Sequence, residues 1–420
     1  MRSQGLIAAL LAGLMALGAA AGVSSRSAAG SALEPGPPRL VARAVLAADT
    51  LAPGPPAGAA LGTDAINGRT PPFAGQPVQG FSAVIEGRRG GYLALSDNGF
   101  GARENSADFL LRLHRVAPRL ETRRGGTGTI ALRGFVSLRD PDRRIPFPIV
   151  GEGTHRRLLT GADLDVESVR RDAHGDLWLG DEFGPFILHT DRRGRALEAP
   201  IPIPGVASPQ NPLLASPEDA NVPSSRGLEG MAISPNGSTL FPMLEGALIG
   251  DPDQRRRLVY SYDIPHGEFA EHRWQYRVEA PEHAIGDLTA LDGHRLLVIE
   301  RDDLQGAEAA FKRVYLIDLR ETDAEGYLVK RELVDLLEVR DPDGISLPAR
   351  EGDIGLGDPF ALPFQTVESL LPIGRGRLLV LNDNNYPFSA GRNPGRPDDT
   401  EAIVVEVPAL RALEAAEAQG

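Results

Sequence analysis

The sequence predicts an all-β fold: a β-propeller of five to seven blades, with six favoured, whose ring is closed by an N-terminal strand. Three observations predict it. One hairpin pattern recurs five times, a third apolar run follows each hairpin, and an orphan apolar strand precedes the first hairpin. Repeated short antiparallel strands are typical of a propeller, because a single hairpin cannot bury its own apolar face.

Each unit contains a polar or acidic residue, an apolar strand, a glycine-containing turn, a second apolar strand and a polar cluster. The units are GFSAVIEGRRGGYLALSDNG (80–99), DVESVRRDAHGDLWLGDEFG (165–184), GLEGMAISPNGSTLFPMLEG (227–246), IGDLTALDGHRLLVIERDD (285–303) and TVESLLPIGRGRLLVLNDNN (366–385). PNG and LDG are strong hairpin signals. The third runs are FLLRLHR (109–115), FILHTD (186–191), LVYSYDI (258–264), VYLIDL (314–319) and IVVEV (403–407).

Two further segments complete the predicted ring. The last unit has only three strands, so we expect RLVARAVLA (39–47) to pair with it and leave no open sheet edge. The long interval after the first unit leaves room for a degenerate blade around TIALRGFVSLRD (129–140). We expect a single propeller domain over 39–410 and a tail over 411–420.

The N-terminus predicts export. Residues 1–23 contain Arg2 and the apolar stretch GLIAALLAGLMALGAAAGV, which is typical of a secretory signal peptide, with an uncleaved anchor as the alternative. Residues 24–38 are small and proline-rich, and we expect a disordered lead-in. The later sequence has no run of 18 apolar residues, so we expect no membrane span in the mature protein and a secreted or periplasmic location.

Composition excludes several functions. The chain of 420 residues has no cysteine and a net charge of −13. Disulfides, thiolate metal sites and a cysteine nucleophile are therefore excluded, and a nucleic-acid partner is not expected without a basic surface. The sequence also lacks a complete nucleophile elbow, a His-Glu-x-x-His motif and a phosphate loop. We expect a monomer.

The hairpin geometry predicts where the acids meet. In an antiparallel hairpin, the start of the first strand and the end of the second lie at one edge. Glu167 is therefore expected beside Asp181 and Glu182, and the other units repeat this spacing. If the first strands line the central channel, two rings of carboxylates surround one mouth. They comprise Glu167, Glu229, Asp287 and Glu368, followed by Asp97, Asp181, Glu182, Glu245, Glu300 and Asp383.

So many converging carboxylates disfavour full ionisation unless cations share the site. Hard divalent cations with oxygen ligands suit it, Ca²⁺ above all. The alternative is that each acid is an ordinary turn former at a strand end. Arg103, Arg226, Arg301 and Lys312 lie near these acids in the sequence, as a phosphoryl-binding site requires; alternatively, each arginine neutralises a neighbouring carboxylate.

These motifs resemble the phytase-like family described as having esterase-like activity, secreted bacterial proteins expected to be β-propellers. The resemblance covers about 78–408 and rests on DVESVRRDAHGDLWLGDEFGPFILHTDRRG, SRGLEGMAISPNG, GDLTALDGHRLLVIERD, FKRVYLIDL and VESLLPIGRGRLLVLNDNN. It implies an ester hydrolase in which calcium at the channel mouth binds substrate phosphate and activates water. Only two lysines occur, so arginines would have to bind the phosphate, which favours phosphate esters generally over phytate.

The resemblance implies roles for the acids. We assign catalytic roles to Glu182, Glu229 and Glu300, and substrate binding to the four cationic residues named above. The expected metal ligands are Asp97, Glu167, Asp181, Glu245, Asp287, Glu368 and Asp383.

We therefore expect a secreted, Ca²⁺-dependent hydrolase of small ester substrates, phosphorylated ones first. A propeller lactonase or carboxyl esterase with one divalent cation is the second hypothesis. A calcium-stabilised propeller that binds its ligand without turnover is the third.

Overall fold

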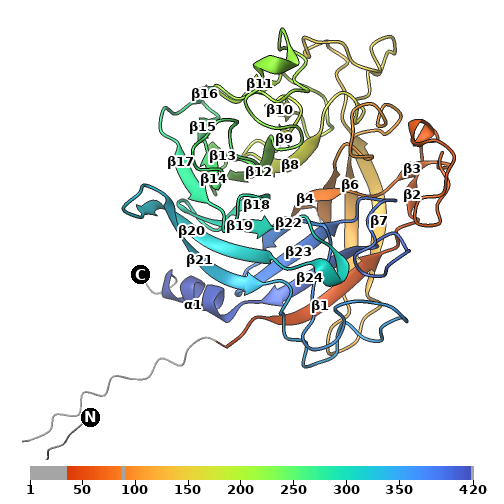
Figure 1. Cartoon of the computed structure of the whole chain (residues 1–420), viewed down its shortest axis with the longest axis vertical. Coiled ribbons are helices and arrows are strands. Elements are labelled where there is room, and N and C mark those ends of the chain that lie inside the picture. Colours follow the sequence, from red (N-terminus) through yellow and green to blue (C-terminus); the bar gives the residue numbers. More distant parts are fainter. Residues whose placement is uncertain (1–35, 88–89, 418–420) are drawn as a thin grey trace, which may run out of the picture. The chain divides into compact units, whose positions relative to one another are not determined.

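The computed structural model describes residues 36–87 and 90–417. The predicted signal peptide (1–23) and most of the predicted lead-in lie outside them. The described strands form an eight-stranded, a six-stranded and two four-stranded sheets, with a two-stranded ribbon beside them. The eight-stranded sheet consists of two groups of four, which are joined into one sheet by the parallel pair Val45–Thr129 between β1 and β7. Apart from the ribbon, the described strands thus fall into five groups (Figure 1).

The five predicted hairpins form the first two strands of these groups. The first group contains β4 (Phe81–Glu86), β5 (Tyr92–Ser96), β6 (Arg112–Arg119) and β7 (Thr129–Ser137). The second contains β8 (Val166–Arg171), β9 (Leu177–Asp181), β10 (Phe186–Thr190) and β11 (Ile201–Pro202). The third contains β12 (Leu228–Ile233), β13 (Thr239–Leu244), β14 (Arg256–Val259), β15 (Tyr262–Asp263), β16 (Glu268–Phe269) and β17 (Trp274–Arg277).

The last two groups complete the set. The fourth contains β18 (Ala284–Ala290), β19 (Arg295–Arg301), β20 (Lys312–Thr322) and β21 (Leu328–Asp335). The fifth contains β22 (Thr366–Pro372), β23 (Arg377–Asp383), β24 (Thr400–Glu406) and β1 (Arg39–Leu46). The ribbon is β2 (Leu51–Ala52) with β3 (Gln76–Pro77), and the chain ends in α1 (Pro408–Glu417).

The expected pairing of the N-terminal strand is confirmed. Strand β1 runs antiparallel to β24, from Arg39 opposite Glu406 to Leu46 opposite Thr400. Figure 1 shows these two ends of the chain side by side as red and blue strands. The pairing covers the edge of β24 that would otherwise offer free backbone groups to another chain.

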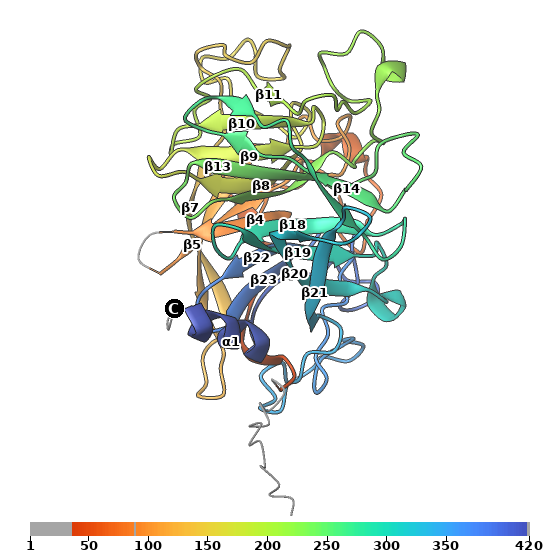
Figure 2. The same cartoon turned by 90° about the vertical axis from the view of Figure 1, so that its left-hand side faces the viewer.

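The structure settles two segments that the sequence analysis left open. Residues 129–137, where the sequence left room for a degenerate blade, form β7 and pair with β6 of the first group. Most of the predicted tail forms helix α1, which begins at Pro408. Leu410 is buried in the same core cluster against which Leu413 packs, and Figure 2 shows the helix below β22 and β23.

The five groups surround a common axis. Each first strand contacts the first strands of the two neighbouring groups, in the cyclic order β4, β8, β12, β18 and β22. Both faces of the inner strands are therefore covered. In β23, Leu378 and Val380 pack toward the fourth group, and Leu379 and Leu381 toward the first. Strands buried on both faces read as continuous apolar runs, which explains sequences such as LLVL.

No helix among the described residues is long and apolar enough to span a membrane.

Candidate active site at the channel mouth

Each first strand has a shift in pairing register close to its start. In β8, Val166 pairs with Asp181 and Ser168 with Gly180, so Glu167 lies between two consecutive pairs. Such a bulge breaks the alternation of the strand and redirects a side chain. The residues at this position in the five first strands are Ser82, Glu167, Glu229, Gly286 and Glu368.

A second ring comes from the ends of the second strands. On each second strand, one residue pairs with the first-strand residue that precedes the bulge. The next residue along the second strand lies at the channel mouth. In the second group, Asp181 is the paired residue and Glu182 the one that lines the cavity. The equivalent residues are Asp97, Glu182, Glu245, Arg301 and Asp383.

All of these residues except Ser82 and Gly286 line a cavity of about 180 Å³. It collects nine of the residues predicted for the site, which are Asp97, Glu167, Glu182, Arg226, Glu229, Glu245, Arg301, Glu368 and Asp383. It also contains polar residues that the sequence analysis missed, which are Asn98, Asp165, Ser225, Asp303, Gln365, Thr366 and Asn385. Asp165 had a usable signal, because it is an acid only two residues before Glu167, at the start of the same predicted unit.

Asp181 does not line this cavity, contrary to expectation. Its side chain is fully buried and accepts hydrogen bonds from the backbone N–H groups of Asp165 (2.8 Å) and Gly184 (2.7 Å). It therefore shapes the turn that carries Glu182. Of the two adjacent acids, only Glu182 faces the mouth.

Asp287 also lies outside the cavity, because it is one residue past the bulge. Its Oδ1 accepts a 2.7 Å hydrogen bond from Arg170 Nη2, and its Oδ2 accepts one of 2.8 Å from the backbone N–H of Leu370. Arg170 lies on β8, Asp287 on β18 and Leu370 on β22. The ion pair therefore ties together three of the five first strands.

Glu300 is a third acid whose predicted place is wrong. Its carboxylate accepts hydrogen bonds from Tyr276 Oη (2.7 Å), the backbone N–H of Glu279 (2.6 Å) and Lys330 Nζ (2.8 Å), and lies 2.9 Å from His283 Nδ1. Although burial opposes it, this set of partners lowers the pKa of Glu300. Both oxygens of this carboxylate therefore already have hydrogen-bond partners, which come from the third and fourth groups and the segment between them.

Two of the predicted substrate-binding cations are likewise engaged elsewhere. Lys312 is fully buried and donates to the side chain of Asp302 and to the backbone oxygens of Asp302 (2.6 Å) and Leu304 (3.0 Å). Arg103 donates to the backbone oxygens of Ala162 (2.9 Å) and Gln210 (3.1 Å). Neither lines the cavity.

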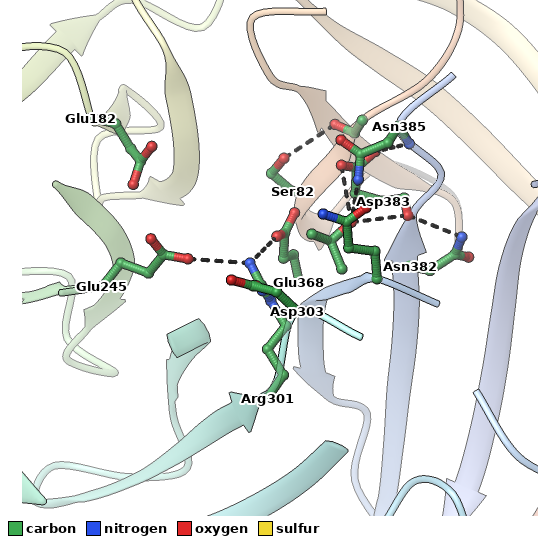
Figure 3. A network of polar contacts seen from close by, with 12 residues as sticks. Ser82, Glu182, Glu245, Arg301, Asp303, Glu368, Asn382, Asp383 and Asn385 are labelled. Atoms are coloured by element: carbon green, nitrogen blue, oxygen red, sulfur yellow. Dashed lines mark hydrogen bonds and ion pairs between the residues drawn. The ribbon is translucent and has the colours of Figure 1, made fainter. Parts of the chain in front are cut away.

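Arg301 and Arg226 are the two cations at the mouth. Arg301 is 3% exposed and donates to Glu368 (2.8 Å), Glu245 (3.2 Å) and Asp303. Figure 3 shows its guanidinium between Glu245 and Glu368. Arg226 lies 3.0 Å from Glu245 and 2.6 Å from Asp303. The two arginines share Glu245 and Asp303, so they form one cationic edge of the cavity.

Several carboxylates of the cavity have raised pKa values, which means that their charged forms are disfavoured. Burial is the largest cause for each. It raises the pKa of Asp97, Glu368 and Asp383 to about 8. The pKa of Glu167 is raised well above its usual value by burial and then by the charges of Asp165 and Glu229.

Two trios of carboxylates could hold a cation. Their ligand oxygens lie within 4.8 Å of one another in Asp165, Glu167 and Glu182, and in Glu167, Glu229 and Glu368. All five side chains are buried. Glu229 Oε1 has no hydrogen-bond donor among the described residues, and a buried carboxylate oxygen without a partner is costly. The donor set contains oxygen only, which fits Ca²⁺.

One family model matches most of the chain. The model of a family described as "Phytase-like: Esterase-like activity of phytase" matches residues 76–386. An "Uncharacterized secreted protein" of Arthroderma benhamiae is 32% identical over 136 residues, which are 27% of this chain and 26% of that protein. The chain thus matches about a quarter of the length of that curated relative.

Solved structures resemble the chain only distantly. The PQQ-bound aldose sugar dehydrogenase of Streptomyces coelicolor is 11% identical, with a TM-score of 0.34 over 89% of this chain and 100% of the other. A protein from Lactobacillus plantarum is also 11% identical, with a TM-score of 0.35 over 77% of this chain and 84% of the other. Neither similarity bears on the chemistry of the site.

Proposed function

The chain belongs to the phytase-like family, and from this premise and the geometry of the channel mouth we propose that it is a Ca²⁺-dependent hydrolase of small phosphate esters. The observation that carries the proposal is the unpartnered Oε1 of Glu229. It lies in a buried trio of carboxylates whose charge no arginine fully neutralises. A cation would satisfy this oxygen and remove the repulsion within the trio.

Each part of the cavity has a role in this proposal. Glu167, Glu229 and Glu368 would hold the ion, and Asp165 with Glu182 would extend the ligand set around Glu167. When bound, Ca²⁺ would stabilise negative charge and lower the pKa of a water molecule. Arg301 and Arg226 orient the anionic group of the substrate, because a guanidinium binds phosphate oxygens in a bidentate manner.

The size of the cavity supports a small reacting group. At about 180 Å³ it is smaller than pockets that enclose a drug-sized ligand, which occupy about 300–1,000 Å³. A phosphomonoester head fits this space, while the rest of the substrate remains outside. This favours simple phosphate esters over a molecule such as phytate, whose several phosphates would need a wider cationic surface.

The proposal includes the architecture and location. The cyclic contacts of the five first strands support a five-bladed propeller. Residues 1–23 support export to the periplasm or the medium. We propose a monomer.

Turnover assays test the proposal. Purified protein, stripped of metal with EDTA, is supplied with calcium and assayed on p-nitrophenyl phosphate and on p-nitrophenyl acetate. We expect calcium-dependent release from the phosphate ester and loss of activity in Glu229→Gln. Turnover of the acetate alone supports instead a carboxyl esterase or lactonase, which the family description also allows. Calcium binding without turnover of either ester supports a ligand-binding propeller.

A further inference from the structure

A second cavity, the arginine pocket, lies away from the channel mouth. Its volume is about 590 Å³. Its cationic residues are Arg39, Arg123, Arg124, Arg375 and Arg377. Arg375 lies in the turn between β22 and β23, whereas Glu368 lies near the start of β22 and Asp383 at the end of β23. The arginine pocket therefore lies at the opposite end of this hairpin from the carboxylates.

The positive charge of the arginine pocket is only partly neutralised. The acids that line it are Asp343 and Glu406, and Glu406 lies 3.3 Å from Arg39 and 3.5 Å from Arg377. In the described part of the chain, Arg123, Arg124 and Arg375 have no ion pair, and Arg377 Nε is buried without a hydrogen-bond acceptor. In a protein of net charge −13, such a local concentration of arginine is a specific attraction for anions.

The inner wall of the arginine pocket is apolar. It is formed by Val41 and Ala42 of β1, Leu120, Ile373 and Val404 of β24. Val41, Leu120 and Ile373 are partly buried at the edge of a core cluster, so an apolar group in the cavity would extend that cluster. The volume falls within the range of about 300–1,000 Å³ that is typical of small-molecule sites.

We propose that the arginine pocket binds a single amphiphilic molecule with a phosphate head and an apolar chain. The arginines of the two turns bind the phosphate oxygens, and the chain packs on the apolar wall. A concave site between two turns and the strands β1 and β24 fits a free monomer rather than the surface of a membrane. This site goes beyond the proposed hydrolysis and does not use the channel mouth.

The chain offers a matched control. Arg123 and Arg124 occupy a tight turn of sequence Arg-Arg-Gly between β6 and β7. Arg192 and Arg193 occupy an exposed turn of the same sequence after β10, outside the arginine pocket. The double variants R123E/R124E and R192E/R193E therefore make the same change of charge in similar turns.

The test is calorimetric titration in EDTA, where the proposed calcium-dependent site at the channel mouth holds no metal, with dodecyl phosphate below its micellar concentration and with inorganic phosphate as the head alone. We expect dodecyl phosphate to bind wild type at least about tenfold more tightly than inorganic phosphate, since each buried methylene contributes. R123E/R124E should weaken the binding of dodecyl phosphate by at least about tenfold, because charge-assisted hydrogen bonds are lost. R192E/R193E should leave this affinity unchanged. Ile373→Asn should weaken the binding of dodecyl phosphate but leave the binding of inorganic phosphate unchanged.

Three results would overturn the proposal. The first is no binding of dodecyl phosphate to wild type, and the second is an equal loss of affinity in the two double variants. The third, from a parallel titration with phosphatidylglycerol vesicles, is binding to the vesicles but not to dodecyl phosphate. Thermal unfolding checks that each variant is folded, and Arg375→Gln replaces R123E/R124E if the latter does not fold. Hydrolysis at the channel mouth should be unchanged in R123E/R124E, which separates this test from that of the proposed function.

Discussion

At the scale of single residues, two adjacent acids with similar sequence signals have opposite roles. Asp181 points into its own turn and accepts two backbone hydrogen bonds, whereas Glu182 lines the cavity. The same division separates Glu300 from Arg301. A shift of one position along the strand therefore decides whether an acid lines the cavity or holds a turn. A variant of the first kind tests metal binding, and a variant of the second kind tests stability.

Glu229→Gln should lower calcium affinity without unfolding the protein. The amide has the shape of the carboxylate but removes one charge from a buried trio. Loss even of an outer-shell group around a metal typically costs 10–100-fold in affinity, so a direct ligand should cost at least about tenfold. Calorimetric titration with Ca²⁺ measures the change, and Glu86→Gln, on an exposed residue at the end of β4, is the control. Equal affinity in the two variants would remove Glu229 from the metal site.

Glu300→Gln should instead reduce stability. The carboxylate balances Lys330 in a buried network, and removing one partner of a buried pair typically costs about 3–5 kcal/mol. Because the folded pKa of Glu300 is lowered, its contribution is present above the unfolded pKa near 4.5 and is lost as pH falls through the folded pKa. Urea unfolding at pH 7 and pH 3 should show a deficit against wild type that narrows at the lower pH.

The control for this variant is Glu338→Gln, at an exposed position without a side-chain partner among the described residues. A deficit of the same size at both pH values would show that the charge of Glu300 is not the stabilising feature.

At the scale of elements, the strands and the closing pair could be predicted from the sequence, but the register could not. The apolar runs and turn residues are local signals, so the hairpins and the pairing of 39–47 follow from them. The bulge depends on how the first strands pack against one another, and no local signal marks it. Aligning Asp287 with Glu167, Glu229 and Glu368 was therefore wrong by one residue, since Gly286 occupies the bulge.

Gly286→Ala should destabilise the protein, because the bulge position of β18 has no room. A Cβ there would lie 2.3 Å from the backbone oxygen of Val367 on the neighbouring first strand. Overpacking of this kind typically costs about 1–3 kcal/mol. Gly293→Ala, in the open turn of the same hairpin, is the control, because its Cβ would meet no atom within 4 Å. Equal unfolding midpoints in urea would show that β18 and β22 are less closely packed than described.

At the scale of the whole molecule, the ring gathers side chains from all five groups at one cavity. Segments as distant as Asp97 and Asp383 meet there, so a cation at the mouth would bind only the closed ring. Calcium should therefore stabilise the folded state by mass action, by about 2.7 kcal/mol at 100 times the dissociation constant. Differential scanning calorimetry should show a higher Tm with calcium, reversed by EDTA. An unchanged Tm at saturating calcium would mean that the ion does not bind the closed ring selectively.

The most direct test of the carboxylate site is a crystal structure of the protein grown with calcium and phosphate. The account predicts Ca²⁺ bound by oxygens of Glu167, Glu229 and Glu368 at about 2.3–2.6 Å, with phosphate between the ion and Arg301. Calcium bound only at other residues, with Glu229 Oε1 still without a partner, would contradict it.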